Sequence, residues 1–330
     1  MNNTNATHPR LETAITFGRI EFMVSRDNAR TWSWPQVVLD SPIDDRDAGV
    51  LETAHGTLLV TTFTSLAYES ILNQARQSSL DNPRAWPAEE LRSWLSAHER
   101  LNAQQRQSEL GQWMIRSTDG GITWSARYPT IVNSPHGPVQ LADGRLLYAG
   151  KELWTGERRV GVCHSIDDGQ SWQWLAEIPV RPGDDTRHYH ELHAVETSSH
   201  RIIVHIRNHN PASDREILQT ESLDAGHTWS VPRPIGVWGL PSHLLRLRDN
   251  RLLVSYGHRR HPLGNQIRLS EDHGQTWSEP FSISSDGTSS DLGYPSTVQL
   301  EDGSFVTVWY EVTQSSPLAV LRQARWSFKP

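Results

Sequence analysis

The chain has 330 residues, a formal net charge of −7 and a sequence pI near 6.1. This acidic balance argues against a nucleic-acid or membrane-surface partner, both of which select basic surfaces. The single cysteine, Cys163, excludes an intrachain disulfide and a cysteine-based zinc cluster. No apolar run approaches a membrane span, and the N-terminus lacks the pattern of a secretory signal. We therefore expect a cytoplasmic protein, or a secreted one if a leader precedes this sequence.

An eight-residue pattern, Ser-x-Asp-x-Gly-x-Thr/Ser-Trp, occurs five times and is called the box below. The copies begin at Ser25, Ser117, Ser165, Ser222 and Ser270, and the first has Ala29 in place of glycine. The aspartate of such a turn accepts hydrogen bonds from backbone N–H groups, glycine permits a positive φ, and tryptophan packs beneath the loop. The box therefore predicts a turn between two strands, and its aspartate is interpreted as structural.

The spacing of the boxes predicts repeated four-stranded units. Successive copies lie 92, 48, 57 and 48 residues apart, and a period near 50 in a strand-rich chain is typical of a β-propeller. A second phrase, strand–turn–strand, recurs at 49–62, 137–150, 192–206, 243–257 and 296–310. We interpret it as the first two strands of each blade. The expected fold is an all-β propeller of six blades, or alternatively five, with N-terminal strands that complete or flank the last blade.

An insertion over residues 66–110 explains the longest interval within what we expect to be a single domain, 1–330. Pro87 stands at a plausible first helical position, and acidic residues follow it. The helical period then places five residues on one face: Leu91, Trp94, Leu95, His98 and Leu101. The helix is expected to pack on the side of the propeller; the alternative is a lid or a dimer contact, through which the chain would form an oligomer.

Ionisable residues gather next to the predicted first strands of the blades. In a propeller the loops before these strands line one mouth of the central channel. Residues 44–47 precede one such strand, and His136 precedes another. The segments 188–193 and 205–209 flank the third pair, 258–261 follows the fourth, and Tyr294 opens the last. We therefore expect the functional site at this mouth.

The boxes and the order of these residues resemble the sialidase superfamily. The resemblance covers most of the chain outside the helical insertion. It implies that Glu191 and Tyr294 are the base and the nucleophile of a retaining glycosidase. It further implies a carboxylate clamp made by Arg46, Arg207 and either Arg259 or Arg260. Guanidinium groups suit this task because they bind carboxylates bidentately, and we expect the clamp also to favour the phenolate form of Tyr294.

The chain departs from the sialidase pattern at the first arginine and at the general acid. Arg46 is followed by Asp47 and Ala48, where sialidases have Ile-Pro. Three residues are candidates for the acid, Asp47, Glu69 and His136, of which we favour Asp47. The implied reaction needs no cofactor, and its partner would be an acidic glycan.

The histidines suggest an alternative reaction. Four of them, His136, His190, His243 and His258, are predicted to line the substrate site. Histidine chemistry beside a carboxylate clamp would also suit a polysaccharide lyase acting on uronate-containing glycans. The spacing matches no zinc signature, so we predict no metal site. A third interpretation is a propeller that binds glycans without turning them over.

Overall fold

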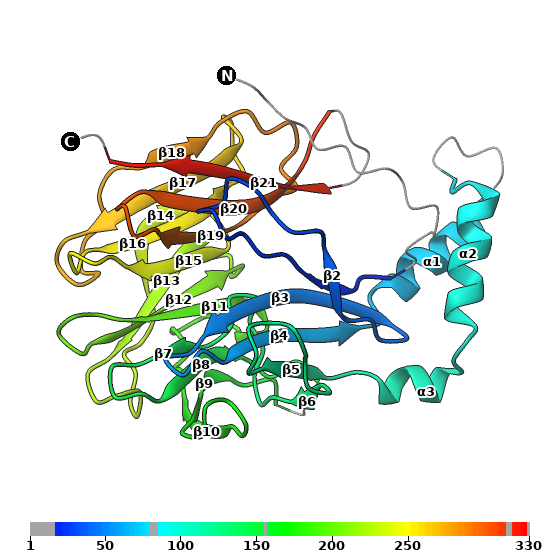
Figure 1. Ribbon diagram of the computed structural model, residues 1–330, viewed down its shortest axis with the longest axis horizontal. Coiled ribbons are helices and arrows are strands. Elements are labelled where there is room, and N and C mark those ends of the chain that lie inside the picture. The colour runs from blue at the N-terminus through cyan, green and yellow to red at the C-terminus, as the bar shows by residue number, and fades with distance from the viewer. Residues whose placement is uncertain (1–16, 79–84, 155–156, 315–318, 329–330) are drawn as a thin grey trace. The chain divides into compact units, whose positions relative to one another are not determined.

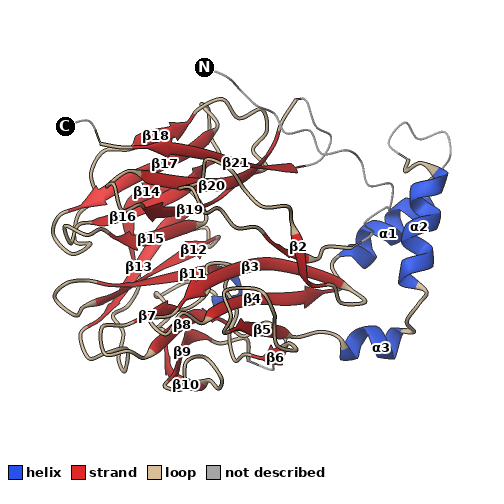
Figure 2. Ribbon diagram, in the orientation of Figure 1, coloured by secondary structure: helices blue, strands red, loops and turns tan. Residues whose placement is uncertain are grey.

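The computed structural model describes residues 17–78, 85–154, 157–314 and 319–328 (Figure 1). The chain divides into two compact units. The helical unit comprises the described parts of 1–21, 37–46 and 64–110; the strand-rich unit comprises 22–36, 47–63 and the described parts of 111–330. Within the described residues, all three α-helices belong to the helical unit (Figure 2).

Five sheets form the blades of a propeller among the described residues. Strands that are consecutive in the chain are neighbours in each sheet. The first blade has β3 (Asp44–Glu52), β4 (Leu58–Ser65), β5 (Gln112–Ser117) and β6 (Tyr128–Pro129). The second has β7 (Val139–Gln140), β8 (Leu146–Lys151), β9 (Val160–Ser165) and β10 (Gln173–Glu177). The third has β11 (Tyr189–Glu196), β12 (Ile202–Asn208), β13 (Glu216–Ser222) and β14 (Arg233–Trp238), preceded by the short 3₁₀ turn Thr186–His188.

The last two blades complete the set. The fourth has β15 (Ser242–Arg246), β16 (Leu252–His258), β17 (Gly264–Ser270) and β18 (Phe281–Ser284). The fifth has three strands, β19 (Leu292–Gln299), β20 (Phe305–Val312) and β21 (Ala319–Trp326). A separate pair is formed by β1 (Ile20–Phe22) and β2 (Gln36–Leu39). The predicted all-β propeller is confirmed, and the sheets correspond to its five-blade alternative.

The apolar core of the strand-rich unit lies between the faces of adjacent blades. One cluster joins the second and third blades and includes Leu147 and Leu192, both fully buried. Another joins the third and fourth blades through Ile203 and Val254. Alternate side chains of a strand point to opposite faces of a sheet, so each middle blade contributes to two clusters. This packing places the first strand of each blade beside its neighbours.

The boxes fold as predicted and also connect the blades. In the fourth copy Asp224 accepts the backbone N–H of Thr228 at 2.8 Å and its hydroxyl at 2.6 Å. Gly226 has a φ of 94°, and a Cβ there would lie 3.1 Å from Leu175 of the preceding blade. The box glycines thus serve close packing as well as the turn. The same contact recurs where Gly169 faces Leu59 and Gly274 faces Ile203.

The N-terminal segment that contains the first box contacts both ends of the series of blades. Gln323 of β21 accepts the indole N–H of Trp32 at 3.0 Å and donates to the carbonyl of Ala29 at 2.8 Å. On its other side, Phe22 packs edge-on against Trp124 of the second box, with ring centroids 5.3 Å apart. The N-terminal segment therefore flanks the last blade, as the sequence predicted.

The helical unit has a core of its own. It contains α1 (Tyr68–Gln77), α2 (Ala88–His98) and α3 (Ala103–Ser108). The predicted face of α2 is confirmed in part, since Leu91, Trp94 and Leu95 pack with Leu101 around Ile43, Tyr68 and Leu72. The helix ends at His98, and a second helix, α3, begins after Asn102, whose side chain forms a capping box with Gln105.

The box aspartates predict a dependence of stability on acid pH. Hydrogen bonds from Thr228 and Ser222 lower the pKa of Asp224 to about 2. A carboxyl whose pKa is depressed in the folded state stabilises the fold above its ordinary pKa near 3.8, and that contribution is lost as pH falls toward 2. We expect Asp224→Asn to lower the melting temperature near neutral pH and to flatten its decline between about pH 4 and pH 2.

Thermal unfolding of both proteins over that pH range measures this effect. Glu271→Gln is the matched control, because Glu271 is an exposed carboxylate in another box, outside the repeated Ser, Asp and Thr positions. Parallel pH curves for Asp224→Asn and the unchanged protein would contradict the assignment.

Candidate active site

Three side chains from distant parts of the sequence meet at one end of the blades. Tyr294 donates its phenolic hydrogen to Glu191 Oε1 at 2.8 Å. Arg207 Nη1 donates to the same carboxylate oxygen at 2.9 Å and to Tyr294 Oη at 3.0 Å. Glu191 opens the third blade, Arg207 closes its second strand, and Tyr294 opens the fifth blade. These are three of the residues that the sequence selected.

Irregularities in the strands direct two of these side chains. In β11 one extra residue is accommodated between Tyr189 and Leu192, where Glu191 lies. In β19 the same happens between Gly293 and Ser296, where Tyr294 lies with a φ of 52°. β-Bulges re-aim side chains near functional sites, and a tyrosine at positive φ is strained unless its surroundings hold it. Of the two residues that touch, Tyr294 is therefore the one with a strained backbone, and Glu191 lies in a bulge.

The electrostatics of the site keep Tyr294 protonated at rest. Burial raises the pKa of this phenol well above 10, and the negative charges of Glu191 and Asp47 raise it further. Arg207 acts in the opposite direction but is outweighed. The direction expected for an arginine is therefore found at Arg207, but burial and the two carboxylates determine the net shift of the Tyr294 pKa. Within the described residues Glu191 Oε2 is buried without a hydrogen-bond partner.

The two neighbouring arginines have different surroundings. Arg259 lies next to the bulge, with Nη2 3.6 Å from the Cβ position of Gly293, and its charge acts against the burial that raises the pKa of the Tyr310 phenol. The Tyr310 ring is 5.7 Å from that of Tyr294. Arg260 instead stacks on Trp238, 3.5 Å from the ring centroid. The structure thus places Arg259, not Arg260, beside Tyr294.

The remaining candidates for clamp and acid are Arg46 and Asp47. Arg46 belongs to the helical unit, where its Nε lies 3.6 Å from Asp44 Oδ2. Asp47 belongs to the strand-rich unit, has a φ of 50°, and its charge acts on Tyr294. Glu69, the second acid candidate, pairs with Arg106 at 2.8 Å within the helical unit. Of these acids, only Asp47 is shown beside Tyr294.

Two of the predicted histidines form a buried cluster with a third. His136, His193 and His243 come from successive blades, and the rings of His193 and His243 stack at 4.5 Å. Burial lowers the pKa of His136 to about 3 and that of His243 to about 4. His193 accepts the backbone N–H of Leu244 at 2.8 Å. The three rings are therefore neutral and form a packed group between blades.

The other two predicted histidines have separate positions. His190 packs edge-to-face on His209 at 5.1 Å, and burial lowers its pKa to about 4. Since Glu191, Lys151 and Arg207 also act on the pKa of His190, this ring belongs to the site. His258 lies against Trp238, and its Nδ1 is 3.1 Å from the carbonyl of Pro262.

Lys151 is a buried residue of the site that the sequence did not reveal. Its ammonium group donates to the carbonyls of Thr186, Arg187 and Tyr189 at 2.9, 3.1 and 3.0 Å. These carbonyls belong to the turn and the strand start that lead directly to Glu191. Since Lys151 is only 8% exposed, its three donors are all used to hold this segment. A lysine at the end of a strand gives no sequence signal for such a role.

The described residues contain neither a candidate metal cluster nor a candidate membrane-spanning helix. In the described part of the chain no cluster of three or more His, Cys, Asp or Glu residues could hold a metal ion. None of the helices described is long and apolar enough to span a membrane.

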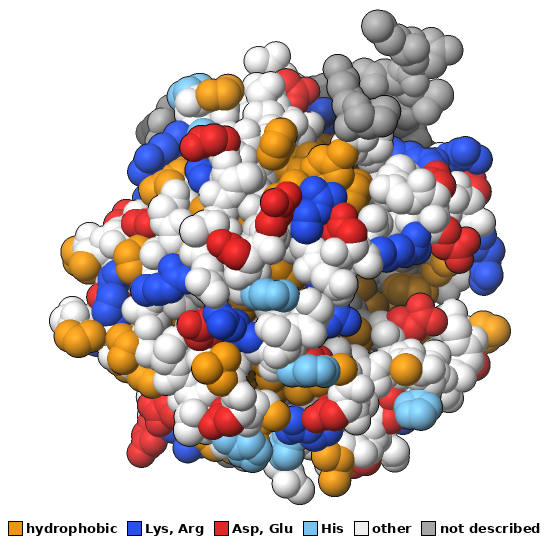
Figure 3. Space-filling model, turned by 90° about the vertical axis from the view of Figure 1, so that its left-hand side faces the viewer, with side chains coloured by type: hydrophobic (Ala, Val, Ile, Leu, Met, Phe, Trp, Pro, Cys, Tyr) orange, Lys and Arg blue, Asp and Glu red, His pale blue; other side chains and the backbone are white. Residues whose placement is uncertain are grey.

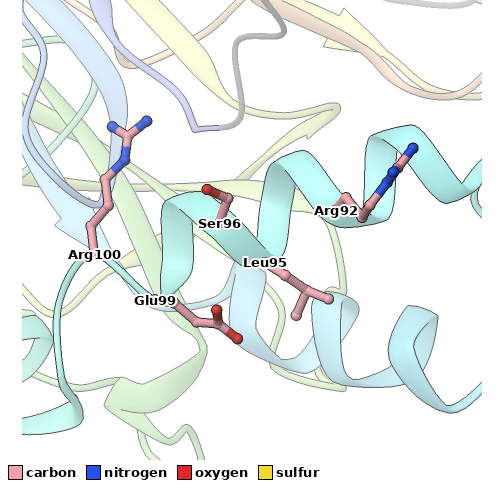
Figure 4. Close-up of a pocket in the computed structure, with 5 residues that line it drawn as sticks. All are labelled: Arg92, Leu95, Ser96, Glu99 and Arg100. Carbon is pink, nitrogen blue, oxygen red and sulfur yellow. The ribbon is translucent and has the colours of Figure 1, made fainter.

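A shallow groove at the C-terminal end of α2 is lined by Arg92, Leu95, Ser96, Glu99 and Arg100 (Figure 4). The face in Figure 3 carries acidic and basic side chains intermingled, without a large field of one sign.

Comparisons with known proteins agree with this architecture. A family model described as a BNR repeat-like domain matches residues 18–307. No curated protein matches the sequence. A solved structure of a Dyadobacter fermentans protein of unknown function is 22% identical, with a TM-score of 0.73 over 94% of this chain and 84% of that one.

Two similar structures are those of enzymes. The intramolecular trans-sialidase from Ruminococcus gnavus, in complex with oseltamivir carboxylate, is 13% identical, with a TM-score of 0.63 over 95% of this chain and 89% of that one. The α-L-arabinanase of Penicillium chrysogenum is 14% identical, with a TM-score of 0.52 over 81% and 77%. At these identities the likeness concerns the fold, a propeller that glycosidases share.

The role of Lys151 predicts a large effect of its removal. Lys151→Met keeps the length of the side chain but leaves three carbonyls without their donor. We expect a loss of about 2–4 kcal/mol in the free energy of unfolding, because buried polar groups left unpaired are costly. Urea unfolding measures this loss, with the exposed Arg246→Met as the control for removing a cation. Equal stability of the two variants would show that the carbonyls find other partners.

Proposed function

The chain belongs to the family of BNR repeat-like domains, and on this basis we propose that it is an exo-acting glycoside hydrolase. Its substrate would carry a terminal acidic sugar, such as sialic acid or a related ulosonic acid, released with retention of configuration. The observation that carries the proposal is the contact of Tyr294 Oη with both Glu191 Oε1 and Arg207 Nη1. A tyrosine nucleophile distinguishes sialidases from most retaining glycosidases.

The arginines would recognise the carboxylate of the sugar. Arg207 bonds to Tyr294, Arg259 lies against the neighbouring Gly293, and Arg46 is the third member of the proposed clamp. Guanidinium groups bind a carboxylate with charge-assisted bonds that are stronger than neutral ones. A carboxylate held there would bring the neighbouring anomeric carbon to the phenol. An aspartate or glutamate nucleophile would be repelled by the same substrate.

Tyr294 would attack the anomeric carbon while Glu191 takes its proton. The 2.8 Å hydrogen bond already directs the phenolic hydrogen to the carboxylate. Because the pKa of Tyr294 is raised, the phenol would lose its proton during attack rather than before it. Asp47, whose charge acts on Tyr294, is the proposed acid that protonates the leaving oxygen.

A polysaccharide lyase is the second candidate function. The observation that favours it is His190, a neutral imidazole beside Glu191 and Arg207. In a lyase such a ring would remove the proton next to a uronate carboxyl that the arginines neutralise, and the sugar at C4 would leave. The two reactions give different products, so one assay separates them.

The proposed nucleophile predicts the outcome of Tyr294→Phe. The variant and the unchanged protein are incubated with a chromogenic α-sialoside and with oligosaccharides that end in a uronate. We expect aglycone release by the unchanged protein and a loss of about a thousandfold or more in the variant, because no other group replaces the nucleophile. Tyr128→Phe is the control, since it removes a buried tyrosine hydrogen bond at another place in the same unit.

The other outcomes of this assay are equally informative. Absorbance near 235 nm, the signal of an unsaturated uronate, would overturn the hydrolase and establish the lyase. Silence in both channels, with the protein folded, would contradict both enzymes and leave the glycan-binding propeller.

The two neighbouring arginines predict unequal effects. Arg259→Met should lower kcat/KM by about 30-fold or more, because it removes a partly buried cation from the carboxylate site. Arg260→Met should change it by less than about threefold, since this side chain stacks on Trp238. Steady-state kinetics on the same substrate compares the pair. Equal losses would show that both arginines face the substrate.

A further inference from the structure

Arg207 is held at two edges of its guanidinium group. Nη1 is directed to Glu191 and Tyr294, as described above. Nε, on another edge, donates to His209 Nε2 at 2.9 Å. A planar guanidinium fixed at both positions has a defined orientation. The histidine therefore determines where the arginine points as much as its acidic partner does.

The contact with Arg207 fixes the proton of His209. A guanidinium has no acceptor, so Nε2 of the ring must be unprotonated to receive the N–H of Arg207. The neutral ring then carries its proton on Nδ1. This atom lies 3.8 Å from Asp214 Oδ1, so the carboxylate charge favours the same tautomer. Aspartate, histidine and arginine thus form a chain of contacts that ends at Tyr294.

The ring of His209 is also held by its neighbours. Its backbone N–H donates to the carbonyl of His188 at 2.9 Å, and the ring packs against His190 at 5.1 Å with the planes 80° apart. The side chain is 27% exposed, so protons from the solvent can reach it. The ring is therefore fixed in place yet able to titrate.

We propose that His209 is the positioning residue of the carboxylate clamp, and that its protonation releases Arg207 from the orientation that serves Tyr294. This inference rests on the proposed function for its catalytic consequence, but the contact itself does not. A proton on Nε2 would remove the acceptor and place a second positive charge 2.9 Å from Arg207 Nε. The clamp would then open toward acid pH.

The charged groups around His209 determine the pH at which this happens. Burial lowers the pKa of His209, the positive charges of Arg207 and Arg215 act in the same direction, and Asp214 and Glu191 act against them. The other titratable ring in contact is His190, from β11. The net shift is downward, so His209 is neutral at neutral pH and titrates below its ordinary pKa of 6.5.

The first test needs no substrate. Long-range ¹H–¹⁵N NMR of the imidazole rings reports which nitrogen of His209 carries the proton and follows its titration. We expect the Nδ1–H tautomer at neutral pH, and a rise of the pKa of His209 in Arg207→Met, because both the donor and the positive charge are gone. An Nε2–H tautomer, or a titration that ignores Arg207→Met, would overturn the proposal.

The second test measures the pH profile of kcat/KM on the substrate established for the enzyme. His209→Gln keeps an acceptor near the position of Nε2 but cannot titrate; His209→Leu has neither property. We expect Gln to retain activity within about threefold with its acid limb shifted down, and Leu to lose about tenfold or more at every pH. His200→Gln, at an exposed histidine paired with Glu196 on the same hairpin, should behave as the unchanged protein.

The outcomes distinguish the role proposed for His209 from the proposed function of the protein. An unchanged acid limb in His209→Gln would show that another group causes that limb and would overturn the switch. Absence of any turnover would contradict the proposed function, whereas the NMR result would still decide whether His209 holds Arg207.

Discussion

Close packing between one blade and the next is the constraint on which the other features of the strand-rich unit depend. The box glycines supply it: a Cβ at Gly169 or Gly274 would lie closer than 3.0 Å to an aliphatic side chain of the preceding blade, and a Cβ at Gly226 would lie 3.1 Å from one. A larger residue would push adjacent sheets apart and open the apolar clusters between them. The blades would then no longer bring β11 and β19 together. Glu191 and Tyr294, which lie 103 positions apart in the sequence, would lose their contact.

The site depends in turn on departures from regular strands. A regular strand alternates its side chains, whereas the bulges at Glu191 and Tyr294 insert one residue and change that alternation locally. Their cost is offset by fixed surroundings: Lys151 holds the approach to Glu191, and Pro295, which needs no ladder partner, follows Tyr294. The packed strands and the fixed neighbouring residues thus hold the irregular backbone that carries Glu191 and Tyr294.

The sequence carries information about these features unequally. The turn of each box is local, because the hydrogen bonds among its repeated Ser, Asp and Thr positions span at most four residues, so turns, strands and the repeat could be predicted from the pattern alone. The blade number was less certain, because the fifth blade has three strands and the first box lies outside the regular series. Arg259 and Arg260 could not be distinguished, since they follow β16 in a turn where strand alternation no longer applies. Lys151 gave no signal, and His209 was placed at the mouth without a role, because the partners of both side chains are set by the folded loops.

The charges at the site oppose one another in a way that suits the proposed chemistry. Burial raises the pKa of Tyr294, and Glu191 and Asp47 raise it further, so the phenol is neutral. Arg207 bonds to both Glu191 and Tyr294, so in the proposed reaction it would stabilise the carboxylate before proton transfer and the phenolate after it. Its orientation therefore matters at both stages. A neutral imidazole on its far edge fixes that orientation without adding a charge of its own, which a carboxylate at the same position could not do.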